Sequence, residues 1–267
     1  LKIIHLFYQV RRYIAQYFKA LNGRGHGIHS PFVFDFVKTV LNSQGVPPAT
    51  IPIETLRSKL LKDKRKLQVT DYGAGSMVNN SANRTIASIC QNTSKSKKLA
   101  LLLHRIVHKY QPESILELGT SLGISTAYLA TGNTSAKVIT CEGSDTVAAI
   151  ARENFRALAL NNIETREGNF DDIIPVLVST INSIDLVFID GNHREVPTIK
   201  YFESILKISG PQTIMIFDDI HWSPGMERAW NRIKSDPRVR MSIDLFFVGI
   251  VLFREEFKVK QNFVIHY

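Results

Sequence analysis

The chain has 267 residues, of which 44% are hydrophobic and 21% are charged, as in an ordinary globular protein with a full core. Its two cysteines exclude a disulfide framework and a cysteine-based metal centre. No apolar run reaches membrane-spanning length and no signal-peptide pattern is visible, so we expect a cytoplasmic protein. The net charge of +9 permits a nucleic-acid partner but does not require one.

Residues 1–66 are predicted to form an N-terminal helical appendage. Apolar residues recur at helical spacing through residues 1–20, with basic residues between them, which indicates an amphipathic helix. The pattern leaves three surfaces open for its apolar side: the core of the protein, a second subunit in a homodimer, or a membrane surface. Ser30-Pro31 then marks the start of another helix.

Residues 67–98 are predicted to form a flap, or linker, over the functional site. The stretch LQVTDYGAGS, residues 67–76, has the form of a strand followed by a glycine turn, but no second strand with an acidic end follows it. We therefore interpret it as a flap rather than as a nucleotide-binding unit. Its candidates for contacting a substrate are Asp71, Tyr72 and Arg84.

Residues 99–267 alternate predicted helices and strands, and they are organised around ILELGTSLGIS at residues 115–125. An apolar strand is followed by a glycine turn and a helix, and a second strand at residues 137–141 ends in Glu142. This order is half of a nucleotide-binding βαβ unit. A carboxylate at the end of the second strand can accept hydrogen bonds from both hydroxyls of a ribose.

The glycine turn does not have the G-x-G-x-x-G spacing of a dinucleotide site. Its glycines are Gly119 and Gly123, and Glu117 precedes them. A carboxylate in that place repels a pyrophosphate and attracts a cation. S-adenosylmethionine carries a sulfonium and an ammonium group, and it therefore fits where NAD fits poorly. The sequence ELGTSLG followed by an acidic strand end resembles the class I methyltransferases.

Three further strands are predicted at residues 163–167, 184–190 and 213–217, and the stretch 239–254 indicates an antiparallel strand pair. The class I methyltransferases that the chain resembles end their sheet with one reversed strand. The expected fold is therefore a Rossmann-like, doubly wound α/β fold, with a mostly parallel seven-stranded sheet whose last strand is antiparallel.

Acidic residues follow most of the predicted parallel strands. Because the carboxyl ends of parallel strands meet at one edge of a sheet, we expect Glu117, Glu142, Asp190, Asp218 and Asp219 to lie along one rim. So many carboxylates repel one another unless cations share the crevice. A sulfonium is one such cation, and a divalent metal held by carboxylate oxygens is a second.

The blocks ILELGTSLGIS, GNFDDIIP, FIDGNH and IFDD resemble, in order and spacing, the small-molecule O-methyltransferases typified by catechol O-methyltransferase, and also uncharacterised bacterial relatives. The resemblance implies that Asp190, Asp218 and Asp219 hold a divalent metal such as Mg2+. The lysine base of that family lies three residues after the first of these aspartates, where this chain has His193. That histidine could act as general base, as metal ligand or as a contact of the cofactor.

Loop positions and the resemblance together define the candidate site. Catalytic roles fall to His193 and Asp190, and substrate contacts to Tyr72, His221 and Trp222. The residues expected to bind S-adenosylmethionine are Glu117, Gly119, Thr120, Ser121, Gly123, Ser125, Glu142, Gly143, Asn169, Phe170, Asp171 and Asp190.

The predicted function is direct transfer of a methyl group from S-adenosylmethionine to an oxygen of a small molecule, with or without a divalent metal. One alternative is a methyltransferase acting on RNA or protein without metal, which the basic composition motivates. A second alternative is a non-catalytic interaction module that keeps the fold, which the large helical appendage motivates.

Overall fold

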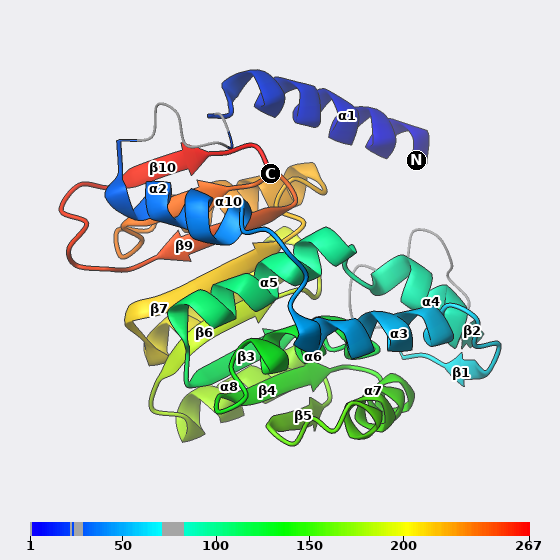
Figure 1. Ribbon diagram of the computed structural model, residues 1–267. Coiled ribbons are helices and arrows are strands. Elements are labelled where there is room, and N and C mark those ends of the chain that lie inside the picture. The colour runs from blue at the N-terminus through cyan, green and yellow to red at the C-terminus, as the bar shows by residue number, and fades with distance from the viewer. Residues whose placement is uncertain (1, 22, 24–28, 71–82) are drawn as a thin grey trace. The chain divides into compact units, whose positions relative to one another are not determined.

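The computed structural model describes residues 2–21, 23, 29–70 and 83–267 (Figure 1). It divides into two compact units. The terminal unit combines Leu1–Ser43 with Leu177–Tyr267, and the central unit is Gln44–Val176. The domain boundaries at residues 66 and 98 stay a prediction. In the part of the chain so described, no helix has the length and hydrophobicity needed to cross a bilayer.

Three parallel strands form the sheet of the central unit, in the order β3-β4-β5. Leu118 at the end of β3 pairs with Cys141 of β4, and Glu142 pairs with Glu167 of β5, so the three strands end close together. The apolar side chains of β3 and β4 are buried, as the apolar residues of β3 predict, whereas Ile163 of β5 is half-buried. The bounds are β3 Ser114–Leu118, β4 Lys137–Glu142 and β5 Ile163–Glu167.

Two helices of the central unit begin at residues whose side chains cap them. Thr85 accepts a hydrogen bond from the Ser88 N–H at the start of α4, and Ser96 does the same for the Leu99 N–H at the start of α5. Buried apolar residues of α3, α4, α5 and α6 pack into one core cluster. The bounds are α3 Ile51–Leu60, α4 Ile86–Thr93, α5 Lys97–Tyr110, α6 Ile124–Gly132 and α7 Asp145–Ala157.

Two short strands, β1 (Lys66–Gln68) and β2 (Asn83–Thr85), pair antiparallel in the stretch predicted as a flap. The following helix, α4, contributes buried residues to the core cluster of the central unit. Tyr72 and Asp71 lie outside the described residues, so their contacts with a substrate stay a prediction.

Five strands form the sheet of the terminal unit, in the order β10-β8-β9-β7-β6. β6 and β7 are parallel, β9 is antiparallel to both β7 and β8, and β10 is parallel to β8. The strand pair predicted within 239–254 is thus confirmed as β8 and β9. The bounds are β6 Ile184–Ile189, β7 Ser209–Asp218, β8 Met241–Asp244, β9 Val248–Leu252 and β10 Gln261–Val264.

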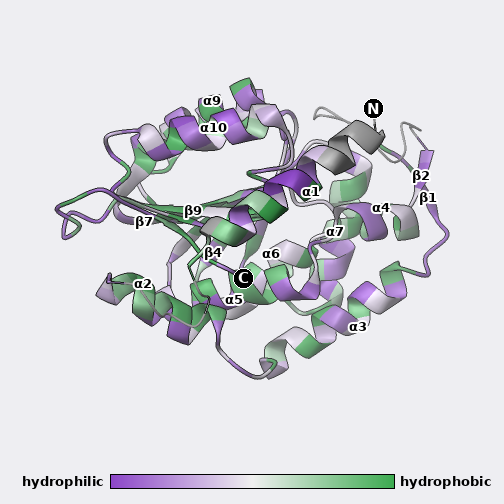
Figure 2. Ribbon diagram, turned by 90° about the horizontal axis from the view of Figure 1, so that it is seen from above, coloured by the Kyte–Doolittle hydropathy of each residue, from purple (hydrophilic) through white to green (hydrophobic). Residues whose placement is uncertain are grey.

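Helices cover both faces of this five-stranded sheet. α9 (Glu195–Ile205) and α10 (Pro224–Ser235) lie side by side on one face, and α2 (Pro31–Phe36) lies on the other (Figure 2). The ring of Trp230 on α10 packs so closely on β9 that a Cβ at Gly249 would lie 2.7 Å from it. The remaining elements are α1 Lys2–Lys19, the π-turn Val37–Leu41, the 3-10 turns Pro48–Thr50 and Leu206–Ile208, and α8 Phe170–Thr180.

The Rossmann-like α/β fold class is confirmed, because parallel strands alternate with helices and one inserted strand, β9, runs antiparallel. The predicted number of seven strands is wrong by one. The described strands β3 to β10 number eight, since residues 261–264 form the additional edge strand β10. The sequence QNFV at that position is too short and too polar to separate a strand from a loop by its pattern alone.

Candidate functional site

The turn after β3 folds sharply because several of its residues adopt left-handed backbone conformations. Gly119, Ser121 and Gly123 have φ angles of 108°, 48° and 81°. At Gly123 a side chain is also excluded by space, since a Cβ there would lie 2.4 Å from the ring of Phe155. The turn brings its backbone N–H groups to the end of β4, where the N–H of Gly119 donates to the carbonyl of Cys141 at 2.9 Å.

Glu142 at the end of β4 is the acid that this turn holds. Its Oε2 accepts a hydrogen bond from the Ser121 N–H at 2.8 Å, and its Oε1 accepts one from the Ser144 N–H at 3.0 Å. The residue is half-buried, and Gly143 beside it is half-buried as well. Each carboxylate oxygen can accept more than one hydrogen bond, so Glu142 can still bind hydroxyl groups of a ligand.

Glu117 lies beneath the turn and is completely buried. Its Oε2 accepts hydrogen bonds from the hydroxyls of Thr126 on α6 and Thr140 on β4. Among the described residues, its Oε1 has no partner in hydrogen-bonding geometry. Burial raises the pKa of Glu117 to about 7, although the hydroxyls of Ser125, Thr126 and Thr140 favour the charged form and oppose the rise.

Two of the three hydroxyl residues predicted to bind the cofactor near this turn are also buried. Thr120 is 1% exposed, and its hydroxyl lies 2.6 Å from that of Thr140. Ser125 is 6% exposed and lies in the first turn of α6. The structure thus places Glu117, Thr120 and Ser125 where they brace the turn from inside the protein.

The loop after β5 forms the third part of this rim. The N–H of Gly168, at a φ of 131°, donates to the carbonyl of Glu142 at 2.9 Å, which ties the loop to β4. Asn169 caps α8, because its Oδ1 accepts from the N–H of Asp171 at 3.0 Å. Asn169 and Phe170 are half-buried and Asp171 is exposed. The predicted cofactor residues of the central unit therefore gather at the ends of β3, β4 and β5.

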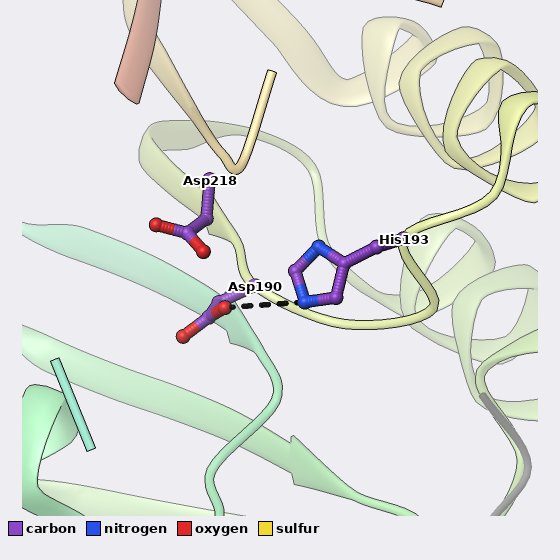
Figure 3. A group of neighbouring side chains, drawn as sticks. All are labelled: Asp190, His193 and Asp218. Carbon is purple, nitrogen blue, oxygen red and sulfur yellow. Dashed lines mark ion pairs between the residues drawn. The ribbon is translucent and has the colours of Figure 1, made fainter. Parts of the chain in front are cut away.

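A second cluster lies in the terminal unit, at the adjacent ends of β6 and β7 (Figure 3). Asp190, His193 and Asp218 each offer one ligand atom, and the three atoms lie within 4.8 Å of one another. The Nε2 of His193 lies 3.7 Å from the Oδ1 of Asp190, and Asp218 is only 2% exposed. Two carboxylates and an imidazole at such distances can hold a divalent cation.

Asp219 does not belong to this group of three ligand atoms. It adopts a left-handed backbone conformation with a φ of 54°, and its N–H donates to the carbonyl of Phe247 at 2.7 Å. The loop after β6 contains a second left-handed residue, Asn192, at a φ of 55°. The Nδ2 of Asn192 donates to the hydroxyl of Tyr201 at 2.9 Å, which fixes the loop that carries His193.

His221 and Trp222, both predicted to contact the substrate, differ in exposure. His221 is 6% exposed, and its Nε2 lies 2.9 Å from the Oδ2 of Asp244, which also accepts from the Nε1 of Trp230 at 3.0 Å. The ring of Phe246 stacks on His221 with 5.3 Å between the ring centroids. Trp222 next to it is half-buried. Their contact with a substrate stays a prediction.

Comparison with known proteins agrees with this geometry. A family model described as a methyltransferase domain matches residues 116–220, which extend from β3 to just beyond β7. Residues 116–220 are thus similar to a methyltransferase domain. A catechol O-methyltransferase from Niastella koreensis is 34% identical over 113 residues, which are 41% of this chain and 50% of that protein. The chain thus spans about half the length of this curated relative.

Solved structures share the fold over more than half of the chain. The O-methyltransferase from Bacillus cereus in complex with SAH has a TM-score of 0.56 at 23% identity, covering 83% of this chain and 97% of that one. The O-methyltransferase TomG from Streptomyces achromogenes in complex with SAM has a TM-score of 0.54 at 22% identity, covering 61% and 82%. At these identities the likeness establishes the fold.

Several residues that build the site of the methyltransferase domain were not among those named from the sequence. Ser144 holds Glu142 through its N–H, and Thr126 and Thr140 hold Glu117. A hydroxyl residue in the first turn of α6 and another in the middle of apolar β4 are the only signals that the sequence offers for them. Thr126 and Thr140 lie 9 and 23 residues from Glu117 in the chain.

Proposed function

We propose that this protein is an S-adenosylmethionine-dependent methyltransferase that methylates an oxygen of a small molecule by direct transfer. The observation that carries the proposal is the carboxylate of Glu142, which two backbone N–H groups hold at a strand end beside a glycine turn. An acid so placed favours ribose hydroxyls and cationic groups over phosphates. The complexes of TomG with SAM and of the Bacillus cereus enzyme with SAH support the same donor here.

The rim of the central unit fits that donor. Glu142 has lone pairs for the ribose hydroxyls, Asp171 is exposed and can accept from the adenine amine, and Phe170 offers an aromatic face. When bound, the donor supplies a methyl group on a positively charged sulfur. The task of the protein is then to bind and orient the two reactants and to exclude water, and positioning alone can supply much of the rate.

The cluster of Asp190, His193 and Asp218 in the terminal unit is the group of residues that would handle the acceptor. A divalent cation held there would stabilise the oxyanion of an acceptor hydroxyl as a Lewis acid. A donor set of two carboxylates and one imidazole suits Mn2+, Fe2+ or Zn2+ as well as Mg2+, which prefers oxygen ligands. Without a metal, His193 is the group that would accept the proton of the acceptor hydroxyl, and Asp190 would orient its ring.

Isothermal titration with S-adenosylhomocysteine tests the donor site. We expect the Glu142→Gln variant to bind about tenfold or more weakly than the wild type, because a lost hydrogen bond to a charged acceptor costs about 1.5–3 kcal/mol. Glu153→Gln, at an exposed position on α7, makes the same chemical change away from the rim and should bind as the wild type does.

Absence of heat and of any thermal shift with either S-adenosylmethionine or its demethylated product would reject the enzyme and leave a non-catalytic module. The acceptor is then sought by a methyl-transfer screen across phenols, sugars, nucleosides and mixed RNA, with and without Mg2+ or Mn2+. Activity that survives a chelator unchanged would reject the metal. Methylation of RNA alone, with binding that falls steeply with salt, would replace the small-molecule acceptor.

A further inference from the structure

The first helix, α1, docks on the terminal unit through its polar side. The hydroxyl of Tyr8 donates to the carboxylate of Glu227, and Arg12 forms an ion pair with the same carboxylate. One turn further on, the Nε2 of Gln16 donates to the Oδ1 of Asp244 at 2.7 Å. Beyond the end of the helix, the N–H of Leu21 donates to the carbonyl of Val264 at 2.7 Å. These contacts fix the rotation of α1 about its own axis.

The apolar side of α1 points away from that contact. Val10, Ile14, Tyr17 and Phe18 are 48%, 51%, 57% and 82% exposed, although Tyr17 also packs on His266. At 100° per residue, these four positions fall within an arc of about 100° on the helix. Apolar segments are visible along the described part of α1 in Figure 2. Amphipathic helices of globular proteins bury their apolar stripe, so this helix has the reverse orientation.

Charge decides what can cover the stripe formed by Val10, Ile14, Tyr17 and Phe18. The sequence of α1 contains Lys2, Arg11 and Lys19, besides Arg12 with its ion pair to Glu227, and it contains no acidic residue. Arg11 is exposed and follows Val10 directly. A second copy of the same helix would bring two basic helices together, which is unfavourable. An anionic surface is complementary, and each basic residue near such a surface contributes about 1 kcal/mol.

The chemistry of the stripe matches the interface of a bilayer. Tyr17 and Phe18 present adjacent aromatic rings, with centroids 5.9 Å apart, and aromatic residues favour the level of the lipid headgroups. Ile14 and Val10 extend the apolar area along the helix. We propose that α1 binds the surface of anionic lipid bilayers, lying in the plane of the interface with the stripe inserted and the rest of the protein outside. This proposal is independent of the proposed methyl transfer.

Co-sedimentation of the full chain with vesicles tests the proposal. We expect binding to phosphatidylcholine vesicles that contain phosphatidylglycerol, and weaker binding when the salt is raised or the anionic lipid is omitted. The double substitution Ile14→Ser and Phe18→Ser should weaken the partitioning more than about tenfold, because it removes two of the four apolar side chains of the stripe.

The matched control is the double substitution Val196→Ser and Val259→Ser, at two exposed apolar positions elsewhere in the terminal unit, which are 74% and 72% exposed. It should bind vesicles as the wild type does. A second readout is Phe18→Trp, whose fluorescence should shift to the blue when anionic vesicles are added.

Three results would overturn the proposal. The first is that the wild type does not bind anionic vesicles at low salt. The second is that it binds neutral vesicles equally well. The third is light scattering that shows a dimer which the Ile14→Ser and Phe18→Ser substitutions dissociate, without vesicle binding. That result would assign the stripe to a second copy of the chain. A melting temperature equal to that of the wild type confirms that the variants are folded.

Discussion

Replacing Glu117 with glutamine removes a carboxyl group that folding buries completely and whose pKa folding raises from 4.5 to about 7. Between these two values the folded protein retains a proton that the unfolded chain releases. The stability of the wild type therefore falls as the pH rises through this window. Above the window, Glu117 makes no further contribution to the pH dependence of stability. Glutamine does not titrate, so the variant lacks this contribution.

The size of the effect follows from the two pKa values. The burial of Glu117 costs about 1 kcal/mol of stability at pH 5 and about 3 kcal/mol at pH 8, since one pKa unit corresponds to about 1.4 kcal/mol. The difference, about 2.5 kcal/mol, corresponds to roughly 5–10 °C in melting temperature for a chain of this size. Between pH 5 and pH 8 the melting temperature of Glu117→Gln should rise by that amount relative to the wild type.

The test is the change in relative melting temperature between pH 5 and pH 8, and not the absolute stability of the variant. The new amide can leave an N–H unpaired near the position of Oε1, which has no partner among the described residues, and this costs about 1–3 kcal/mol at every pH. Glu153→Gln, at an exposed position, is the control and should show no such difference. If the difference in melting temperature between the wild type and Glu117→Gln stays constant from pH 5 to pH 8, the burial argument is refuted.

Two further substitutions test the glycine turn after β3 and the cluster of Asp190, His193 and Asp218. Gly123→Ala should destabilise the protein by about 2–4 kcal/mol, because it adds a clash with Phe155 to the strain of a positive φ. Gly45→Ala, at a φ of 89° with open space around it, should cost only about 1 kcal/mol; equal losses of melting temperature would refute the clash. His193→Asp should shift metal preference toward Mg2+ if this residue is a ligand, and abolish activity under all metals if it is the base.

The strand ends that carry the acids could be predicted because their position follows from topology. Apolar runs followed by Glu142, Asp190 or Asp218 indicate parallel strands, and parallel strands place their carboxyl ends together. The roles of two neighbouring aspartates could not be predicted in the same way. Asp218 contributes to the cluster, whereas Asp219 adopts a left-handed conformation set by its hydrogen bond to Phe247, a residue 28 positions away.

The position of Glu117 inside the protein rather than on the rim also depends on distant parts of the chain. The hydroxyl groups that bind it come from α6 and β4, and neither has a spacing that marks it in the sequence. The orientation of α1 is a stronger case. Its periodicity leaves the core, a second subunit or a membrane surface open for the apolar side. The polar side is the one that docks, because Glu227 and Asp244, more than 200 residues away, supply partners for Arg12 and Gln16.

The three atoms of the Asp190, His193 and Asp218 cluster also limit the chemistry open to this site. A neutral imidazole has one lone pair, on one of its two ring nitrogens, and that pair can bind a metal or accept a proton but not both. His193 points Nε2 toward Asp190, at 3.7 Å. If a cation occupies the cluster, His193 is therefore a ligand, and the acceptor hydroxyl must lose its proton to another group or to water. If no cation binds, Nε2 can carry the proton that faces Asp190, and the lone pair on Nδ1 is then the one that would accept the proton of the acceptor hydroxyl.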